Sequence, residues 1–322
     1  MSPERTNIGM PYPPVRSGPT TSSPTVGVNN AGRVGWRAAA GASRALVPGR
    51  LRILAYHGVP DASRFAVQVA HLVGSYNVVV GSDVASALRG EGRLPKRAVW
   101  ITFDDGRPDV VAHGQEVLDQ AGVRATLFVC PDPTENRTPL WFDAVRKAGP
   151  IDLDDRAVAG DEAVRAMKKV PDSRRRQALE RLPAAAAHQP TASIEDLERW
   201  AGAGHEIGNH SWDHPCLDQC PPQEQARQVR LADGWLQARF PGPRLWAYPN
   251  GDWGEGAERA LRELGYEVGL LFDHRLASVR QHPLRLSRLR VDAGAPLDRF
   301  RAIVSGAHPL AYEVVRRLRR SE

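Results

Sequence analysis

The sequence contains two neighbouring carboxylates, Asp104 and Asp105, directly after the apolar run 101–103 and before Gly106. In α/β folds, catalytic groups gather at the carboxyl ends of strands, where the loops converge. Two adjacent acids repel each other in such a place, so a cation or a shared proton is expected to relieve the repulsion. An Asp-Asp-Gly sequence is also common in ordinary turns, so this motif alone leaves both interpretations open.

A second group of candidate residues is the pair His210 and His214, again at the end of a predicted strand. Imidazoles at positions i and i+4 project to one side if the chain turns helically there. Two neutral imidazoles joined by a carboxylate form a donor set that suits zinc and leaves positions for water and substrate. The acid pair and the histidine pair, at matching strand ends, together predict a metal site.

The elements that must position these residues follow from the hydrophobic pattern that starts at residue 51. Short apolar runs alternate with amphipathic stretches, which is typical of strand and helix units around a mostly parallel sheet. Seven segments are predicted strands: 51–56, 99–103, 125–130, 205–211, 245–249, 266–272 and 284–291. Helices are predicted at 110–120, 194–201, 223–239 and 257–264, and Ser193 with Asp196 provides the start signal of the second.

Three regions depart from this alternation. Residues 1–48 carry seven prolines and few aromatic residues, too little apolar surface to offset the entropy of ordering the chain, and they predict a disordered tail. Residues 131–190 are polar and rich in charge, and we expect them to form a partly helical insertion within a domain spanning 49–305. Residues 306–322 are expected to form a basic C-terminal helix.

Composition limits the class of protein further. With 42% hydrophobic and 25% charged residues, and no apolar run near the roughly 20 residues of a membrane span, no transmembrane segment is expected. The net charge of +6 favours acidic surfaces, but no nucleic-acid motif accompanies it. The arginine clusters at 174–176 and 316–320 are interpreted as solvated helix faces. No oligomeric state is predicted.

The cysteines and the N-terminal segment bear on the cellular location. Three cysteines cannot all pair within one chain, which fits a reducing compartment, and Cys216 and Cys220 are interpreted as packing residues. The first 48 residues lack the continuous apolar core of a secretory signal, about 7 to 15 residues long. A cytoplasmic location is therefore expected, with export by another route or from another start codon left open.

Taken together, the two motifs resemble those of a known family. Residues 102–106 (Thr-Phe-Asp-Asp-Gly) and 210–214 (His-Ser-Trp-Asp-His) are similar to the motifs of the polysaccharide deacetylase family, the NodB-homology group of carbohydrate esterases. The resemblance extends over about residues 51–292 and includes 54–59, 125–129, 204–210 and 247–251.

The resemblance implies an α/β fold, a distorted (β/α)7 barrel, consistent with the seven predicted strands. It also implies a metal-dependent deacetylase that acts on N-acetylated amino sugars. One divalent ion, with zinc as the expected ion, would be held by Asp105, His210 and His214, and Asp104 would be the general base. A backbone N–H at Asn250 would help to stabilise the oxyanion.

Two departures from the family pattern concern the groups around the base. Ala247 stands where many relatives have an arginine that holds the base, which leaves the orientation of Asp104 open. The late Leu-x-x-His motif, at 284–291 here, contains no histidine, and this version with Arg288 resembles the branch associated with exopolysaccharides. His57, His282 or solvent remain as proton donors to the leaving amine, and His57 could instead be a structural histidine at the rim.

Aromatic residues beside the motifs are candidates for substrate binding. Trp212, Trp246 and Tyr248 are the predicted set, and Trp253 lies close to them in the sequence. A flat ring can stack on a sugar face while its polar group bonds a hydroxyl. Core packing is an equal alternative for the tryptophans.

Three functions remain open at this point. The leading hypothesis is removal of an N-acetyl group from an amino sugar in a polysaccharide, an oligosaccharide or a glycosylated metabolite. The second keeps the metal and changes the substrate to a non-sugar amide. The third is a weakly active, glycan-binding relative, motivated by Ala247 and the missing late histidine.

Overall fold

The structure, a computed structural model, describes residues 50–153, 156–182 and 190–309. The predicted tail at 1–48 lies outside these residues, as does most of the predicted C-terminal helix at 306–322. Among the described residues, no helix is long and apolar enough to cross a bilayer.

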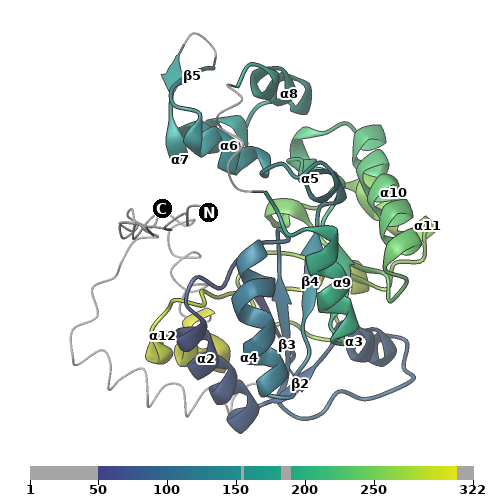
Figure 1. The fold of residues 1–322 in the computed structure, drawn as a ribbon. Coiled ribbons are helices and arrows are strands. Elements are labelled where there is room, and N and C mark those ends of the chain that lie inside the picture. Colours follow the sequence, from purple (N-terminus) through teal and green to yellow (C-terminus); the bar gives the residue numbers. More distant parts are fainter. Residues whose placement is uncertain (1–49, 154–155, 183–189, 310–322) are drawn as a thin grey trace, which may run out of the picture.

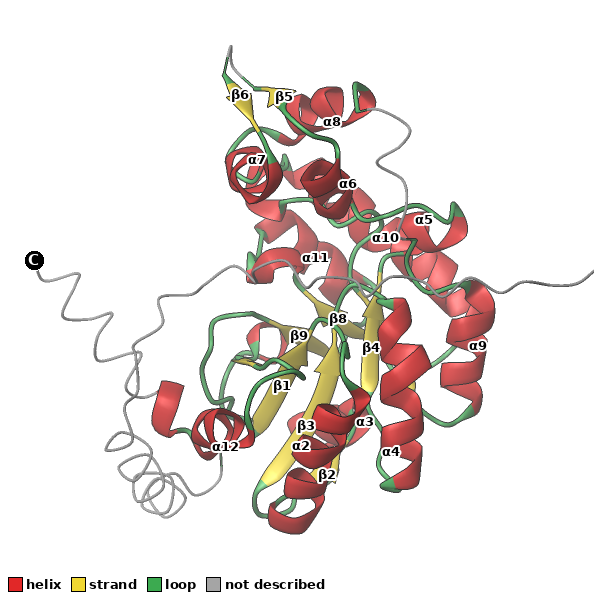
Figure 2. Cartoon of the chain, turned by 60° about the vertical axis from the view of Figure 1, so that its left-hand side comes forward, coloured by secondary structure: helices red, strands yellow, loops and turns green. Residues whose placement is uncertain are grey.

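A parallel sheet forms the centre of the molecule (Figures 1 and 2). Its strands lie in the order β10-β1-β3-β4-β7-β8-β9, and β2 pairs with β3. Their bounds are β1 Arg52–Tyr56, β2 Asn77–Val79, β3 Ala98–Phe103, β4 Thr126–Val129, β7 Glu206–Asn209, β8 Leu245–Ala247, β9 Val268–Leu270 and β10 Leu289–Arg290. Each of the seven predicted strand segments contains one of these strands, whereas the short β2 was not predicted.

The sheet curls until its two edges approach each other. Leu270 of β9 forms a parallel bridge with Leu286, in the segment that leads into β10, and the Leu271 N–H donates to the Leu286 carbonyl at 2.8 Å. The result is an α/β fold with a curled parallel sheet, which confirms the predicted distorted barrel.

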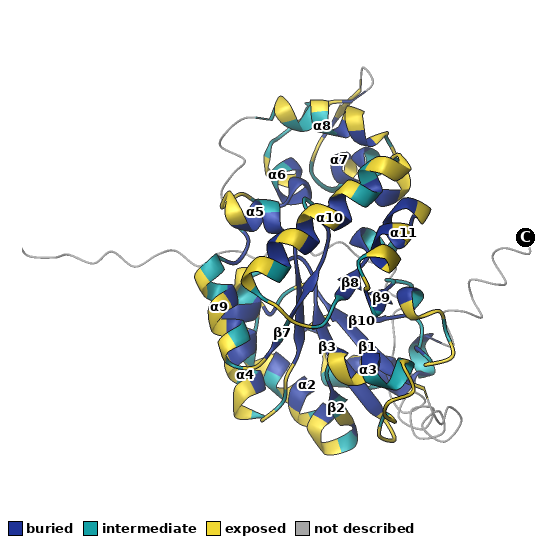
Figure 3. Ribbon diagram, turned by 90° about the vertical axis from the view of Figure 1, so that its right-hand side faces the viewer, coloured by how far each residue is buried: buried dark blue, intermediate teal, exposed yellow. Residues whose placement is uncertain are grey.

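The strands are buried on both faces, so their sequences are almost continuously apolar (Figure 3). Alternate side chains enter two different clusters: Ile53 and Trp100 pack inside the curl, while Leu54 and Ile101 face the surrounding helices. The helices next to this outer cluster are α2 Ala62–Ser75, α4 Gln115–Gln120, α9 Ile194–Gly202 and α12 Leu297–Ser305. On another side, α10 Pro222–Arg239 packs on α11 Glu255–Glu263.

The helix boundaries follow local signals. Helix α9 begins after Ser193, whose Oγ accepts from the Asp196 N–H while the Asp196 carboxylate accepts from the Ser193 N–H, as the capping motif predicts. The segment predicted as one helix at 110–120 begins instead with a π-helical turn, η1 Val110–Gly114, and continues as α4. Helix α3 Gly81–Leu88 lies near β9.

Residues 131–182, called the insert below, form a small helical unit above the carboxyl ends of the strands (Figures 1 and 2). It comprises α5 Pro131–Glu135, α6 Trp141–Lys147, the two-stranded ribbon β5 Ile151–Asp152 and β6 Ala157–Val158, α7 Gly160–Met167 and α8 Asp172–Glu180. Its apolar side chains make a cluster of their own, which Cys130 and Cys216 join from the barrel. The insert therefore rests on the same end of the sheet that carries the candidate residues.

Candidate functional site

The two aspartates lie where β3 ends. The Asp104 N–H still donates to the Tyr56 carbonyl at 2.9 Å, and the chain then turns through Asp105 and Gly106, both with positive φ (73° and 58°). Both carboxylates are 2% exposed. A buried carboxylate stays ionised only where cations or hydrogen-bond donors stabilise its charge. The neighbours of each carboxylate therefore indicate its role.

Asp105, His210 and His214 converge on one point. The three potential ligand atoms lie within 4.8 Å of one another, and all three residues are buried. Asp105 Oδ1 is 3.5 Å from the Nε2 atom of each histidine. Ligands at about 2.0–2.2 Å from a tetrahedral ion are separated by roughly 3.4 Å, so this spacing suits a shared divalent ion.

The histidine pair converges for a different reason than the one predicted. Residues 210–214, called the ligand loop below, do not form a helical turn. The rings meet because Ser211 and His214 adopt left-handed backbone conformations, with φ of 72° and 59°. The ring centroids of His210 and His214 are 4.9 Å apart. Such conformations in non-glycine residues cost energy and gather at functional sites.

The surroundings of the two imidazoles act differently on their protonation: burial lowers the pKa of His210 but the carboxylates of Asp104 and Asp105 outweigh it and raise this pKa, whereas the pKa of His214 is lowered. His210 Nδ1 is 2.8 Å from the Ala247 carbonyl, which accepts the Nδ1 proton and leaves the Nε2 lone pair facing Asp105. Burial, followed by the neighbouring His210, lowers the pKa of His214 to about 3, so this imidazole is neutral near pH 7. A neutral imidazole with a free nitrogen is the form that binds metals.

Buried polar atoms without hydrogen bonds test whether the site fits a metal ion. Among the described residues, Asp105 Oδ1 and His214 Nδ1 are buried side-chain atoms without a hydrogen-bond partner. Burial raises the pKa of Asp105, but the neighbouring His210, His57, His214 and Arg107 outweigh it and hold this pKa far below its usual range. An ionised, buried oxygen without a hydrogen bond, facing two imidazoles, is the environment that a divalent cation would satisfy. The residues fit a metal.

Asp104 is held by an arginine that the sequence did not assign to it. Nη1 and Nη2 of Arg288 donate to Oδ1 and Oδ2 of Asp104 at 2.7 and 2.8 Å, and Nε donates to the Leu271 carbonyl at 2.8 Å. The Arg288 side chain is fully buried. Directly before the last strand, Arg288 thus supplies to Asp104 the kind of contact that was left open by Ala247. Burial raises the pKa of Asp104, but Arg288, His210 and His57 outweigh it, so the net pKa is lowered.

His57 is the histidine that the structure brings to Asp104. Its Nε2 is 3.9 Å from Asp104 Oδ2, its side chain is 44% exposed, and its ring meets the edge of Phe272 at 5.0 Å. Partial desolvation is the main influence on the pKa of His57 and lowers it, although the carboxylates of Asp105 and Asp104 oppose this. His282 instead accepts the Leu284 N–H and caps a short turn.

Asn250 follows β8 in a turn beside the site. It adopts a left-handed conformation, with φ of 58°, and its Nδ2 lies 3.8 Å from Cys216 Sγ. Gly251 packs so closely on Phe272 that a Cβ atom there would lie 2.6 Å from the Phe272 backbone nitrogen. The turn that carries Asn250 is therefore fixed against the loop after β9.

The prediction of substrate contact is wrong for two of the three aromatic candidates. Trp246 and Tyr248 are fully buried in a cluster with Leu217, so neither ring can stack on a sugar. Trp212 is partly exposed and packs against the outer cluster. Trp253 is 40% exposed, and the Arg285 guanidinium lies over one face of its ring at 3.7 Å.

The interpretation of residues 174–176 as a solvated face is also wrong in part. Arg175 is 1% exposed and Arg176 is half-buried in an ion-pair network. Arg107 lies 3.7 Å from Asp105 and pairs with Asp143 of the insert at 2.5 Å. Cys216 and Cys220 are free, buried residues, as expected of packing cysteines.

Comparison with known proteins agrees with the motifs. The profile of the polysaccharide deacetylase family matches residues 91–269, more than half of the chain. The chain belongs to the polysaccharide deacetylase family. The protein YxkH of Bacillus subtilis (strain 168) is 21% identical over 269 residues, which cover 80% of this chain and 77% of YxkH.

Solved structures show the same fold. The Streptococcus pyogenes deacetylase PplD, solved in complex with acetate, is similar with a TM-score of 0.58 and 18% identity, over 80% of this chain and 99% of PplD. IcaB from Ammonifex degensii is similar with a TM-score of 0.54 and 17% identity, over 80% of this chain and 97% of IcaB.

Proposed function

We propose that this protein is a metal-dependent hydrolase that removes the N-acetyl group from an amino sugar. The observation that carries the proposal is the buried triad of Asp105, His210 and His214 directly beside a second, arginine-held carboxylate, Asp104. Membership of the polysaccharide deacetylase family supports it, as does the structural similarity to the deacetylase PplD.

Asp105, His210 and His214 would hold one divalent ion, and their two nitrogens and one oxygen favour zinc. Such an ion supplies a Lewis acid that polarises the amide carbonyl and acidifies water. The His210 Nδ1 contact with the Ala247 carbonyl fixes the ring so that Nε2 faces the site.

Asp104 takes the proton of the attacking water. The two bonds from Arg288 set the plane of the carboxylate and keep it ionised, as a general base must be. Each carboxylate oxygen keeps a further acceptor position, and His57 lies on the Oδ2 side. The backbone N–H of Asn250 is proposed as a donor to the oxyanion.

Between the two histidines considered as proton donors, we place this role at His57. It lies 3.9 Å from the base and is partly open to solvent, whereas His282 is engaged in a helix cap. A proton taken up at Asp104 can pass through this side of the site to the leaving nitrogen.

Metal analysis and acetate release test the proposal together. We expect about one equivalent of zinc or a similar ion in the purified protein, little in the His210→Ala/His214→Ala variant, and metal-dependent release of acetate from N-acetylated amino-sugar oligomers. A protein that takes up no metal on reconstitution, or that binds metal and cleaves no acetamido sugar, would contradict it. A panel that includes non-sugar amides separates the second function.

The third function, a glycan-binding protein without turnover, was based on two observations, Ala247 and the missing late histidine, and the first of these no longer supports it. Position 247 carries no arginine, but Arg288 bonds both oxygens of the proposed base, Asp104. Glycan binding without acetate release from the metal-saturated protein would favour that function over ours.

A further inference from the structure

The ligand loop, residues 210–214, is held from the barrel side by side-chain acceptors. Asn209 Oδ1 accepts the Ser211 N–H at 2.8 Å. Gln228 Oε1 of α10 accepts the N–H groups of the next two residues, at 3.1 Å each. These bonds fix the first half of the loop and leave the carbonyl of His214 to other partners.

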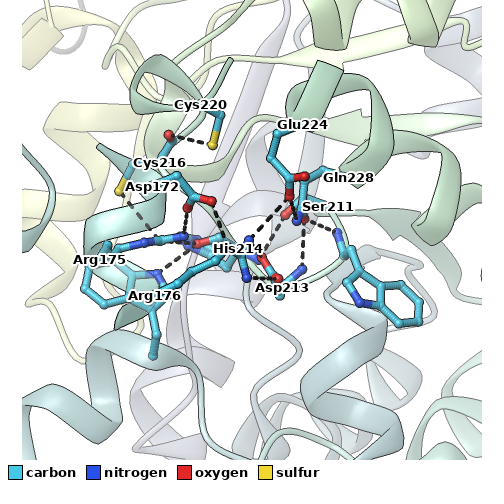
Figure 4. A network of polar contacts seen from close by, with 12 residues as sticks. Asp172, Arg175, Arg176, Ser211, Asp213, His214, Cys216, Cys220, Glu224 and Gln228 are labelled. Carbon is cyan, nitrogen blue, oxygen red and sulfur yellow. Dashed lines mark hydrogen bonds and ion pairs between the residues drawn. The ribbon is translucent and has the colours of Figure 1, made fainter. Parts of the chain in front are cut away.

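Those partners come from the insert. Trp141 Nε1 donates to the His214 carbonyl at 2.8 Å, and Arg175 Nη1 approaches the same oxygen at 3.4 Å. Arg176 donates to both oxygens of Asp213, at 2.7 and 3.1 Å. Figure 4 shows the two arginines of α8 directed at the residues Asp213 and His214.

The arginines are themselves fixed by carboxylates. Asp172, 5% exposed at the start of α8, pairs with Arg175 and also accepts from Arg176 Nε at 2.7 Å. Glu224 of α10 lies 3.4 Å from Arg176 Nη2 (Figure 4). A buried or half-buried charge network keeps its geometry because breaking one pair leaves an uncompensated charge. The insert thus presents an ordered pair of guanidinium groups to the ligand loop.

The two histidines differ in what orients them. His210 has a direct side-chain partner in the Ala247 carbonyl. His214 Nδ1 has none among the described residues, and its backbone is left-handed. Such a conformation costs of order 1–3 kcal/mol and persists only where the surroundings fix it. The direction of the His214 ring therefore depends on the backbone contacts and on Phe142 of the insert, whose ring lies 5.0 Å away.

We propose that the insert is a positioning element of the metal site, and that Arg176, through Asp213, together with Trp141 aims His214 at Asp105. A second link from the insert reaches the same site, because Asp143 pairs with Arg107 beside Asp105. Arg176 is a positioning residue, since its recorded contacts are with carboxylates outside the donor triad. The inference rests on the proposed metal-dependent function.

The test measures metal affinity rather than turnover. Zn²⁺ is titrated against a chromophoric chelator in the metal-stripped full-length parent, in Arg176→Gln and in Arg181→Gln, a control for an exposed arginine that ends the same helix. Outer partners of ligating residues typically contribute 10- to 100-fold to metal affinity. We expect Arg176→Gln to weaken Zn²⁺ binding by about tenfold or more and Arg181→Gln to bind like the parent, with each metal-free variant shown by its melting curve to be folded at the temperature of the titration.

Three further variants make the outcome decisive. Asp213→Asn is expected to weaken Zn²⁺ binding as Arg176→Gln does, and the double variant to be no worse than either, because both remove one interaction. Arg176→Lys is expected to restore part of the affinity, as a point charge cannot reproduce the paired bonds. Parent-like affinity in both single variants would overturn the inference alone, whereas a parent that binds no Zn²⁺ would overturn the proposed function with it.

Discussion

The base and the second histidine ligand lie side by side but are held by different parts of the molecule. Asp104 is clamped inside the barrel by Arg288, a buried residue next to the last strand. His214 is held largely through its backbone, by Trp141 and Arg175 of the insert. Under the proposed function, the geometry of proton transfer would be tied to the barrel, whereas the geometry of metal binding would depend on the insert. The predictions below test that division.

The largest effect is expected at the base. Asp104→Asn keeps the size of the side chain but cannot take up a proton, so turnover should fall by roughly 10² or more. Metal content should stay near that of the parent, because the donor triad does not include Asp104. Elemental analysis beside an acetate-release assay measures both. Loss of metal in this variant would mean that the roles of the two aspartates are exchanged.

A smaller but diagnostic effect is expected at Arg288. In Arg288→Met the burial that raises the pKa of Asp104 is no longer opposed by the guanidinium, so this pKa rises. Activity requires the ionised carboxylate, and the acid limb of the kcat/KM profile should therefore move to higher pH, by about one unit or more. The metal-free protein should also lose about 3–5 kcal/mol of stability, as a buried charge loses its partner.

Arg288→Lys is the control that distinguishes loss of the positive charge from a general folding defect. A lysine keeps the positive charge and loses the paired geometry, so we expect a smaller pH shift than in Arg288→Met. If both variants kept the parent's pH profile while turnover dropped, the electrostatic role of Arg288 would be refuted.

On the insert side, Trp141→Phe should weaken metal binding without moving the pH profile. The change removes the N–H that the His214 carbonyl accepts and leaves only the longer contact from Arg175. A lost hydrogen bond of about 1 kcal/mol corresponds to roughly fivefold in Zn²⁺ affinity. Trp200→Phe is the matched control, because the indole of Trp200 also donates to a backbone carbonyl, that of Glu206 at the start of β7, outside the insert. Equal affinities for the two variants would argue against the division.

The smallest effect on turnover is expected at the rim. Trp253 offers one open face, its other face being covered by Arg285. If it stacks on a sugar, Trp253→Ala should raise KM for an oligosaccharide by roughly three- to tenfold and leave kcat near that of the parent. Trp246→Phe, in the core, should lower stability and leave KM unchanged. A KM that is the same in parent and Trp253→Ala would remove this ring from the substrate site.

The sequence predicted the features of the site that depend on local order. The acid pair after an apolar strand and the paired histidines after another were expected to meet, because parallel strands bring their carboxyl ends to one edge. The structure places Asp105, His210 and His214 together as expected. The parallel sheet was predicted from short apolar runs, which are typical of buried parallel strands, whereas its curling into a distorted barrel was implied by the family resemblance.

What the sequence could not reveal depends on distant contacts. Arg288 reaches Asp104 across 184 positions of the chain, and no local pattern predicts that pairing. The arginines of α8 were taken for surface residues because charge runs are usually solvated, yet they face buried carboxylates. Trp246 lies in β8 and Tyr248 directly after it, and β8 is buried on both faces. Alternate side chains of such a strand do not face solvent, so both rings are in the core.

The left-handed residues have a consequence for the evolution of this chain. Of seven non-glycine residues with positive φ among those described, four belong to the site: Asp105, Ser211, His214 and Asn250. Glycine would adopt these conformations more easily, so selection for folding alone would favour it there. A copy of the chain freed from the proposed catalysis should drift toward glycine at position 214, gaining stability as it loses a proposed metal ligand. The side chains now present at these positions therefore lower the stability of the fold and provide the groups that the proposed chemistry needs.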